Sequence, residues 1–141
     1  EMEVVTEQLY DDGVYLLQRV AESDPGLAAE MEKLLARQGG CPAGDRIVNV
    51  DYRGNVHLCP YWQDRTIGNI REQKLSDICF DEENEVLTMM KDKTQYLKGK
   101  CGRCMHKHLC RGCGARAEEM CGDPFGADPA CYLTEEEVTT V

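Results

Sequence analysis

The first forty residues space their apolar side chains as two amphipathic helices would. The first apolar stripe, which predicts a helix over residues 6–22 with Thr6 as its N-cap, consists of Tyr10, Val14, Leu17 and Ala21. Asp24 and Pro25 then favour the cap and first turn of a second helix, which Gly39 and Gly40 would end. The second stripe consists of Leu27, Met31, Leu34 and Leu35. This pattern predicts a helical hairpin with no chemistry of its own.

Beyond residue 40 the pattern changes to short runs. Residues 46–52 and 55–59 flank a turn at Arg53 and Gly54, which predicts a β-hairpin. We expect residues 61–70 to form an irregular loop, with Trp62 filling the core. Short helices are predicted over 74–79 and 82–91, with buried faces supplied by Leu75, Ile78, Val86, Leu87 and Met90. A hairpin with short helices predicts a small α+β domain.

The cysteine-rich stretch that follows contains four cysteines with the spacing of metal ligands. The spacing is Cys101-x2-Cys104-x5-Cys110-x20-Cys131. A Cys-x2-Cys loop directs two sulfurs to one centre, a third arrives after one further turn, and a distant fourth closes the site. Structural zinc, the alternative, usually has two short-spaced pairs separated by a longer gap. The spacing therefore favours a cubane iron–sulfur cluster over zinc.

Glycines around these cysteines would let backbone amides approach the sulfurs closely. We expect a helix from near Gly112 to Met120, followed by a turn-rich strap over 123–131 that delivers Cys131. Cys41 and Cys59 flank the predicted hairpin, which would bring both thiols to the same end of a small sheet. They are therefore candidates for a second ligand pair.

Composition supports metal binding by these thiols. The chain has nine cysteines in 141 residues, an odd number that argues against a closed disulfide framework. There is no apolar signal segment and no run long enough to span a membrane, so we expect a cytoplasmic, metal-binding protein without a membrane partner. The formal net charge of -10 argues against a nucleic-acid partner.

Charge is distributed unevenly. Residues 91–116 carry eight basic residues and one acid, on an otherwise acidic chain. One interpretation is that these bases compensate the negative charge of a thiolate-bound cluster. The other is that Arg103, Lys107 and Arg111 form a binding face for an anionic substrate or an acidic electron donor.

Three further side chains are weaker candidates for metal ligands. Cys79 lies on the apolar face of a predicted helix, and we interpret it as a small core residue. We interpret His106 and His108 as surface residues.

The whole pattern resembles the SPASM type of auxiliary iron–sulfur domain, found at the C-terminus of many radical S-adenosylmethionine (SAM) enzymes. The resemblance is carried by Cys41-x12-Gly54-x4-Cys59, then Cys101-x2-Cys104-x5-Cys110-x2-Cys113, then Cys131. The sequence around the cysteines is similar to that of the tetrapyrrole-modifying members, namely the radical SAM proteins of haem d1 synthesis and the didecarboxysiroheme enzymes. The similar segments read GNVHLCPYW, IGNIREQKLSDI, KGKCGRC and GARAEEMCGDPFGADPACYLTEEE.

The resemblance implies a domain organisation and a ligand set. Residues 1–40 would be the end of a radical SAM barrel, 41–137 the SPASM-like domain and 138–141 a tail. One [4Fe–4S] cluster would be held by Cys101, Cys104, Cys110 and Cys131, and a second by Cys41, Cys59 and Cys113. The fourth ligand of the second cluster stays open between Cys121, His57, a residue outside this chain and the substrate. Two-cluster relatives usually leave three residues before the last cysteine of the loop, whereas only two separate Cys110 from Cys113.

The radical-generating Cys-x3-Cys-x2-Cys motif is absent from the 141 residues, so we expect that this chain alone does not cleave SAM. The resemblance implies an auxiliary cluster domain that transfers electrons and binds substrate in haem or haem d1 biosynthesis. The implied partners are a radical SAM barrel domain or subunit that binds SAM, an anionic tetrapyrrole, and an acidic flavodoxin or ferredoxin. The alternatives are a stand-alone electron carrier, the auxiliary domain of a peptide-modifying radical SAM maturase, and a structural zinc module.

Overall fold

The computed structural model describes residue 2 and residues 10–139. The expected N-cap Thr6 lies outside the described residues. The chain divides into two compact units, one formed by Glu1–Cys41 with Leu97–Val141 and the other by Pro42–Tyr96. We call the first the helical unit and the second the sheet unit. The helical hairpin and the cysteine-rich stretch therefore belong to one unit, although the sheet unit separates them in the sequence.

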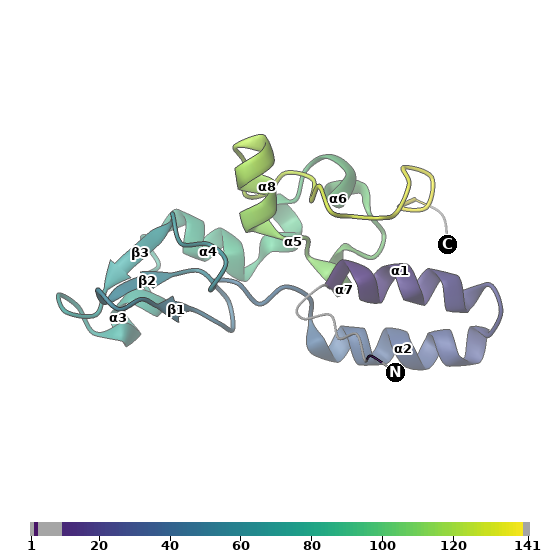
Figure 1. The fold of residues 1–141 in the computed structure, drawn as a ribbon, viewed down its shortest axis with the longest axis horizontal. Helices are drawn as coiled ribbons and strands as arrows, with labels where there is room; N and C mark the ends of the chain where they lie inside the picture. The colour runs from purple at the N-terminus through teal and green to yellow at the C-terminus, as the bar shows by residue number, and fades with distance from the viewer. Residues whose placement is uncertain (1, 3–9, 140–141) are drawn as a thin grey trace. The chain divides into compact units, whose positions relative to one another are not determined.

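The helical unit begins with the predicted hairpin, α1 (Tyr10–Ala21) and α2 (Pro25–Gln38), whose helices run antiparallel side by side (Figure 1). The Asp24 carboxylate accepts a hydrogen bond of 2.9 Å from the Leu27 amide, and Gly39 ends α2 in the left-handed conformation. Both predicted ends of α2 are confirmed. Its predicted apolar stripe is wrong at Leu27 and Leu34, which are exposed, because α2 packs through a narrower strip that includes the buried Ala28.

The core of the helical unit joins the hairpin to the cysteine-rich stretch. Val14 and Leu17 of α1 pack in one cluster with Ala28, Cys104, Leu109, Leu133 and Val138. We expected Val138 to begin a tail, but it is fully buried in this cluster. A predicted ligand, Cys104, is therefore part of the hydrophobic core that holds the unit together.

Three short helices organise the cysteine-rich stretch, namely α6 (Gly99–Arg103), α7 (Lys107–Cys110) and α8 (Gly114–Cys121). The helix expected between Gly112 and Met120 is confirmed as α8. The other two were not predicted, because four or five residues are too few to show a helical period. α7 packs against both helices of the hairpin.

The sheet unit contains a three-stranded antiparallel sheet in the order β1-β2-β3, with β1 (Asn49–Val50), β2 (Asn55–His57) and β3 (Thr66–Asn69). The hairpin is confirmed, with shorter strands than expected and its turn at Gly54. The loop expected over 61–70 is wrong where β3 pairs with β2, Val56 opposite Gly68. The four residues of β3 have no strong alternation, so the pairing partner defines this strand.

The remaining helices of the sheet unit are α3 (Leu75–Cys79), α4 (Glu85–Lys91) and α5 (Lys93–Tyr96). Buried side chains include Val56, Leu58, Trp62, Ile78, Leu87 and Met90. Leu75 is exposed, contrary to expectation, whereas Trp62 fills the core as predicted. The small α+β fold is confirmed. Among the described residues, no helix has the length and hydropathy needed to cross a bilayer.

Candidate metal centre

The structure brings four predicted ligands together in the helical unit. Cys101 on α6, Cys104 at its end, Cys110 on α7 and Cys131 on the strap line one pocket. The pocket encloses about 420 Å³ of empty space, part of which is open to solvent. Its apolar wall is formed by Val14, Leu97, Leu133 and Val138. Four cysteines that are up to 30 residues apart in sequence thus line one largely apolar pocket.

Backbone amides donate to two of these sulfurs. The Asp128 amide lies 3.2 Å from Cys101 Sγ, and the Gly112 amide lies 3.4 Å from Cys110 Sγ. Gly112 has a φ of 56°, and a β-carbon added there would lie 3.3 Å from Cys101 Sγ. This close approach explains why a glycine occupies the position. Amide donors of this kind stabilise thiolates and tune a cluster's potential.

Burial disfavours the ionised form of these thiols when no metal binds them. It raises the pKa values of Cys101, Cys104 and Cys110 above the usual value of a cysteine. A bound metal supplies the positive charge that deprotonates coordinating thiols. The ammonium groups of Lys100 and Lys107 reach the Cys131 and Gly102 carbonyl oxygens at 3.1 and 3.2 Å, and both lysines line the pocket. The donor set and its surroundings therefore fit an anionic iron–sulfur cluster.

A buried carboxylate next to the pocket was missed by sequence reasoning. Asp128 Oδ1 accepts from Arg116 Nε at 2.8 Å and from the Ala130 amide at 3.1 Å. Asp128 Oδ2 accepts from an Arg116 terminal nitrogen at 2.6 Å and from the Cys113 amide at 2.7 Å. Burial alone would raise the pKa of Asp128, but the hydrogen bonds from Arg116 and the two amides outweigh it and hold this pKa below its usual value.

Two of the three residues expected at a second cluster lie in the helical unit. The Cys41 amide donates to the Cys110 carbonyl at 2.9 Å, and a β-carbon on the preceding Gly40 would lie only 2.5 Å from that oxygen. Cys113 is the N-cap of α8, and burial raises the pKa of its thiol. Cys59 belongs to the sheet unit, just after β2, and is buried there.

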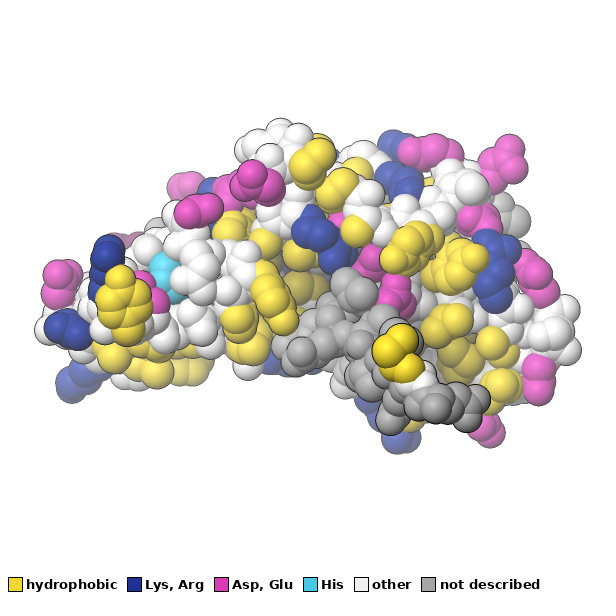
Figure 2. Space-filling model, in the orientation of Figure 1, with side chains coloured by type: hydrophobic (Ala, Val, Ile, Leu, Met, Phe, Trp, Pro, Cys, Tyr) yellow, Lys and Arg dark blue, Asp and Glu magenta, His cyan; other side chains and the backbone are white. Residues whose placement is uncertain are grey.

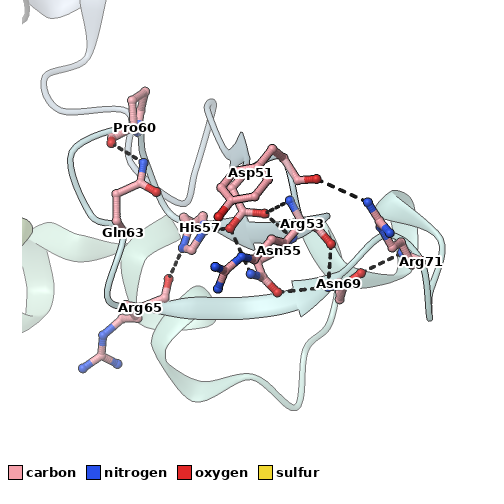
Figure 3. Close-up of polar contacts among 10 residues, drawn as sticks. Asp51, Arg53, Asn55, His57, Pro60, Gln63, Arg65, Asn69 and Arg71 are labelled. Carbon is pink, nitrogen blue, oxygen red and sulfur yellow. Dashed lines mark hydrogen bonds and ion pairs between the residues drawn. The ribbon is translucent and has the colours of Figure 1, made fainter.

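The other candidate ligands are engaged elsewhere or lie outside the pocket. Figure 3 shows both ring nitrogens of His57 facing protein groups, with Nδ1 3.3 Å from the Arg65 carbonyl and Nε2 3.5 Å from Asp51 Oδ2. Cys121 is exposed at the end of α8, and Cys79 is partly buried on α3. Within residues 10–139, which include all nine cysteines, none forms a disulfide. The same residues contain no group of three or more His, Cys, Asp or Glu arranged for a single metal ion.

Much of the basic segment is paired within the chain. Arg103 contacts Glu135 at 2.6 Å, Lys98 contacts Asp123 at 2.6 Å, and Arg116 contacts Asp128. Arg111 is only 8% exposed, so its side chain is not displayed to solvent as an anion-binding face requires. On the face visible in Figure 2, basic and acidic side chains are interspersed. Three of the eight bases are therefore paired with carboxylates of this chain, whereas Lys100 and Lys107 lie at the pocket.

Residues 41–105 match the family model of SPASM, described as an iron–sulfur cluster-binding domain. The match begins at Cys41 and includes Cys59, Cys101 and Cys104, while Cys110 and Cys131 follow it. This match confirms the resemblance to SPASM domains seen in the sequence, over residues 41–105.

Three named relatives are similar to this chain. The chain is 34% identical over 141 residues to the pre-heme d1 synthase of Dinoroseobacter shibae, covering 99% of this chain and 35% of the relative. It is 35% identical over 140 residues to the Fe-coproporphyrin III synthase of Methanosarcina barkeri, covering 96% of this chain and 35% of the relative. An AdoMet-dependent heme synthase of the same organism is 40% identical over 92 residues, 65% of this chain and 25% of the relative. The chain thus spans about a third of the length of the first two. No solved structure matches it significantly.

Proposed function

We propose that Cys101, Cys104, Cys110 and Cys131 hold one [4Fe–4S] cluster. The observation that carries this proposal is that all four line a single pocket, with amide donors aimed at two of the sulfurs. When bound, such a cluster accepts and donates single electrons. The residues of this chain would hold it, exclude water through the wall around Leu133 and Val138, and offset its charge with Lys100 and Lys107.

A second cluster is proposed at Cys41, Cys59 and Cys113. Its support comes from the sequence pattern and from the family match, which begins at Cys41 and includes Cys59. Cys121 remains a candidate for its fourth ligand, although it is exposed. His57 is a poor candidate, because the contacts of its two ring nitrogens already hold it in the sheet unit.

We propose that this chain is the auxiliary cluster part of a radical SAM enzyme, and that the enzyme acts on an anionic tetrapyrrole in haem or haem d1 biosynthesis. The support is that relatives of this chain are named pre-heme d1 synthase, Fe-coproporphyrin III synthase and AdoMet-dependent heme synthase. The clusters would pass electrons to or from the substrate, with a flavodoxin or ferredoxin as external donor. A radical SAM barrel, in the same chain or in a partner, would bind SAM.

A substrate-binding role is proposed for Lys107 and Arg103 rather than for Arg111. Lys107 lines the pocket beside the proposed cluster, and Arg103 is more than half exposed although it pairs with Glu135. An exposed ion pair of this kind contributes little and exchanges easily with a substrate carboxylate.

Metal analysis of anaerobically purified protein tests the first cluster. The full chain should contain iron and acid-labile sulfide, and Cys131→Ala should lose about one cluster's share of both. Cys121→Ala and Cys79→Ala are matched controls, because neither thiol lines the pocket, and both should keep that cluster. Stoichiometric zinc without sulfide, in protein made with ample iron, would support the zinc alternative and refute the proposal.

A further inference from the structure

Asp128 contacts one expected ligand of each proposed cluster. Its backbone amide donates to Cys101 Sγ at 3.2 Å, and its carboxylate accepts from the backbone amide of Cys113 at 2.7 Å. Cys113 has no side-chain cap for α8, so the Asp128 carboxylate takes a capping role from a distant segment. A single residue therefore contacts the sulfur of Cys101 and the backbone of Cys113, two cysteines that are 12 positions apart.

The charge of this carboxylate is balanced by one arginine. Arg116 holds both oxygens of Asp128 in a fork and also reaches Asp11 Oδ1 on α1 at 3.1 Å. Each oxygen of Asp128 also accepts from a backbone amide. A buried ion pair is costly unless every group in it is satisfied, and the two oxygens of Asp128 have four donors. The pair is therefore held firmly beside the pocket, which Asp128 and Asp11 both line.

We propose that Asp128 and Arg116 form a positioning pair that fixes Cys101 and Cys113, and that their opposite charges set the reduction potential of the cluster held by Cys101. This inference rests on the proposed cluster. Reduction makes a thiolate-bound cluster more negative, so a nearby cation favours the reduced form and a nearby anion disfavours it. Arg116 also contacts Asp11, so the three groups together carry one formal negative charge. Removing Asp128 makes their sum neutral, and removing Arg116 leaves two negative charges.

A role limited to stability predicts a different outcome. If the pair only held the fold, each single substitution would lower stability, and any change in potential would follow the loss of structure with the same sign. Electrostatic control predicts shifts of opposite sign in Asp128→Asn and Arg116→Gln. The sign of the shift therefore separates the two roles.

The experiment is a redox titration of the full chain, purified anaerobically and followed by electron paramagnetic resonance, with iron and sulfide measured in each sample. Asp128→Asn should raise the midpoint potential, because one negative charge beside the cluster is lost while Arg116 and Asp11 still offset each other. Arg116→Gln should lower it, because Asp128 and Asp11 remain negative. The double variant should return toward the wild-type potential. Asp123→Asn is the matched control on the same strap: its partner Lys98 is 65% exposed, and water screens the lost charge, so no shift is expected.

Shifts of the same sign, or no shift, in variants that keep their iron would overturn the proposal. If both single variants lose iron, Asp128→Glu and Arg116→Lys preserve the charges. Iron retained in these two while the neutral variants lose it supports the proposal, because the charges then hold the ligands. Iron lost from all four together with native circular dichroism overturns it, because the pair is then merely structural. A wild-type chain without iron would instead refute the proposed cluster, so the two failures are distinguishable.

Discussion

Replacing Gly112 by alanine should impair cluster binding, because this residue lies between two of the proposed ligands. Its amide donates to Cys110 Sγ at 3.4 Å, and an added β-carbon would lie 3.3 Å from Cys101 Sγ. The left-handed backbone costs an alanine about 1–2 kcal/mol of folding free energy. The added methyl group must also displace a sulfur or the loop, and disturbing the surroundings of a metal ligand typically lowers metal affinity about 10–100-fold. That factor adds about 1.4–2.8 kcal/mol to the loss in the iron-bound state.

Gly122→Ala provides the matched control. Gly122 ends α8 with a φ of 70°, and an added β-carbon would have nothing within 4 Å. It should therefore lose the same backbone free energy as the Gly112 variant and keep its iron. Thermal unfolding measures the shared cost, and iron, sulfide and visible absorbance measure the difference. Full iron loading in Gly112→Ala, or equal loss in Gly122→Ala, would refute the steric argument.

Three other predictions concern the core, the sheet unit and the metal. Leu109→Ala removes a buried side chain from the cluster that contains Cys104 and should cost about 2–5 kcal/mol in unfolding free energy; a cost below about 1 kcal/mol would contradict the assigned core. Burial opposes ionisation of Asp51, but hydrogen bonds from Asn55 and the Arg53 amide outweigh it and lower the pKa of Asp51 from 3.8 to about 2. The carboxylate therefore contributes stability above pH 3.8 that is lost as the pH falls toward 2. The difference in unfolding free energy between wild type and Asp51→Asn should shrink over that interval. A difference independent of pH would contradict this. Removal of iron by chelation should destabilise the helical unit, because the free energy of metal binding to the folded chain is then lost. Circular dichroism of matched iron-loaded and iron-free samples checks this; equal unfolding temperatures would argue against a structural role for the metal.

The sequence was sufficient where a structure is completed within a few residues. Asp24 caps α2 through an amide three residues away, and Gly39 ends the same helix with its own backbone. The turn at Gly54 and the burial of Trp62 are local signals of the same kind. The Cys-x2-Cys spacing likewise placed Cys101 and Cys104 at one pocket, because two residues cannot separate their sulfurs widely.

The tertiary structure alone decided features whose partners are distant in the sequence. Which side of α2 is buried depends on the packing of α1 and α7, and this leaves Leu27 exposed although its spacing fits the apolar stripe. Strand β3 exists because β2 is beside it. In the sequence, nothing distinguishes Asp128 from the other acidic residues, of which the chain has 26 in all. Folding brings it to Cys101, 27 positions away, and to Arg116. Arg116 in turn contacts Asp11, which is 105 positions from it. Desolvation makes such a charge costly unless its partners are in place, and only the folded chain shows that they are.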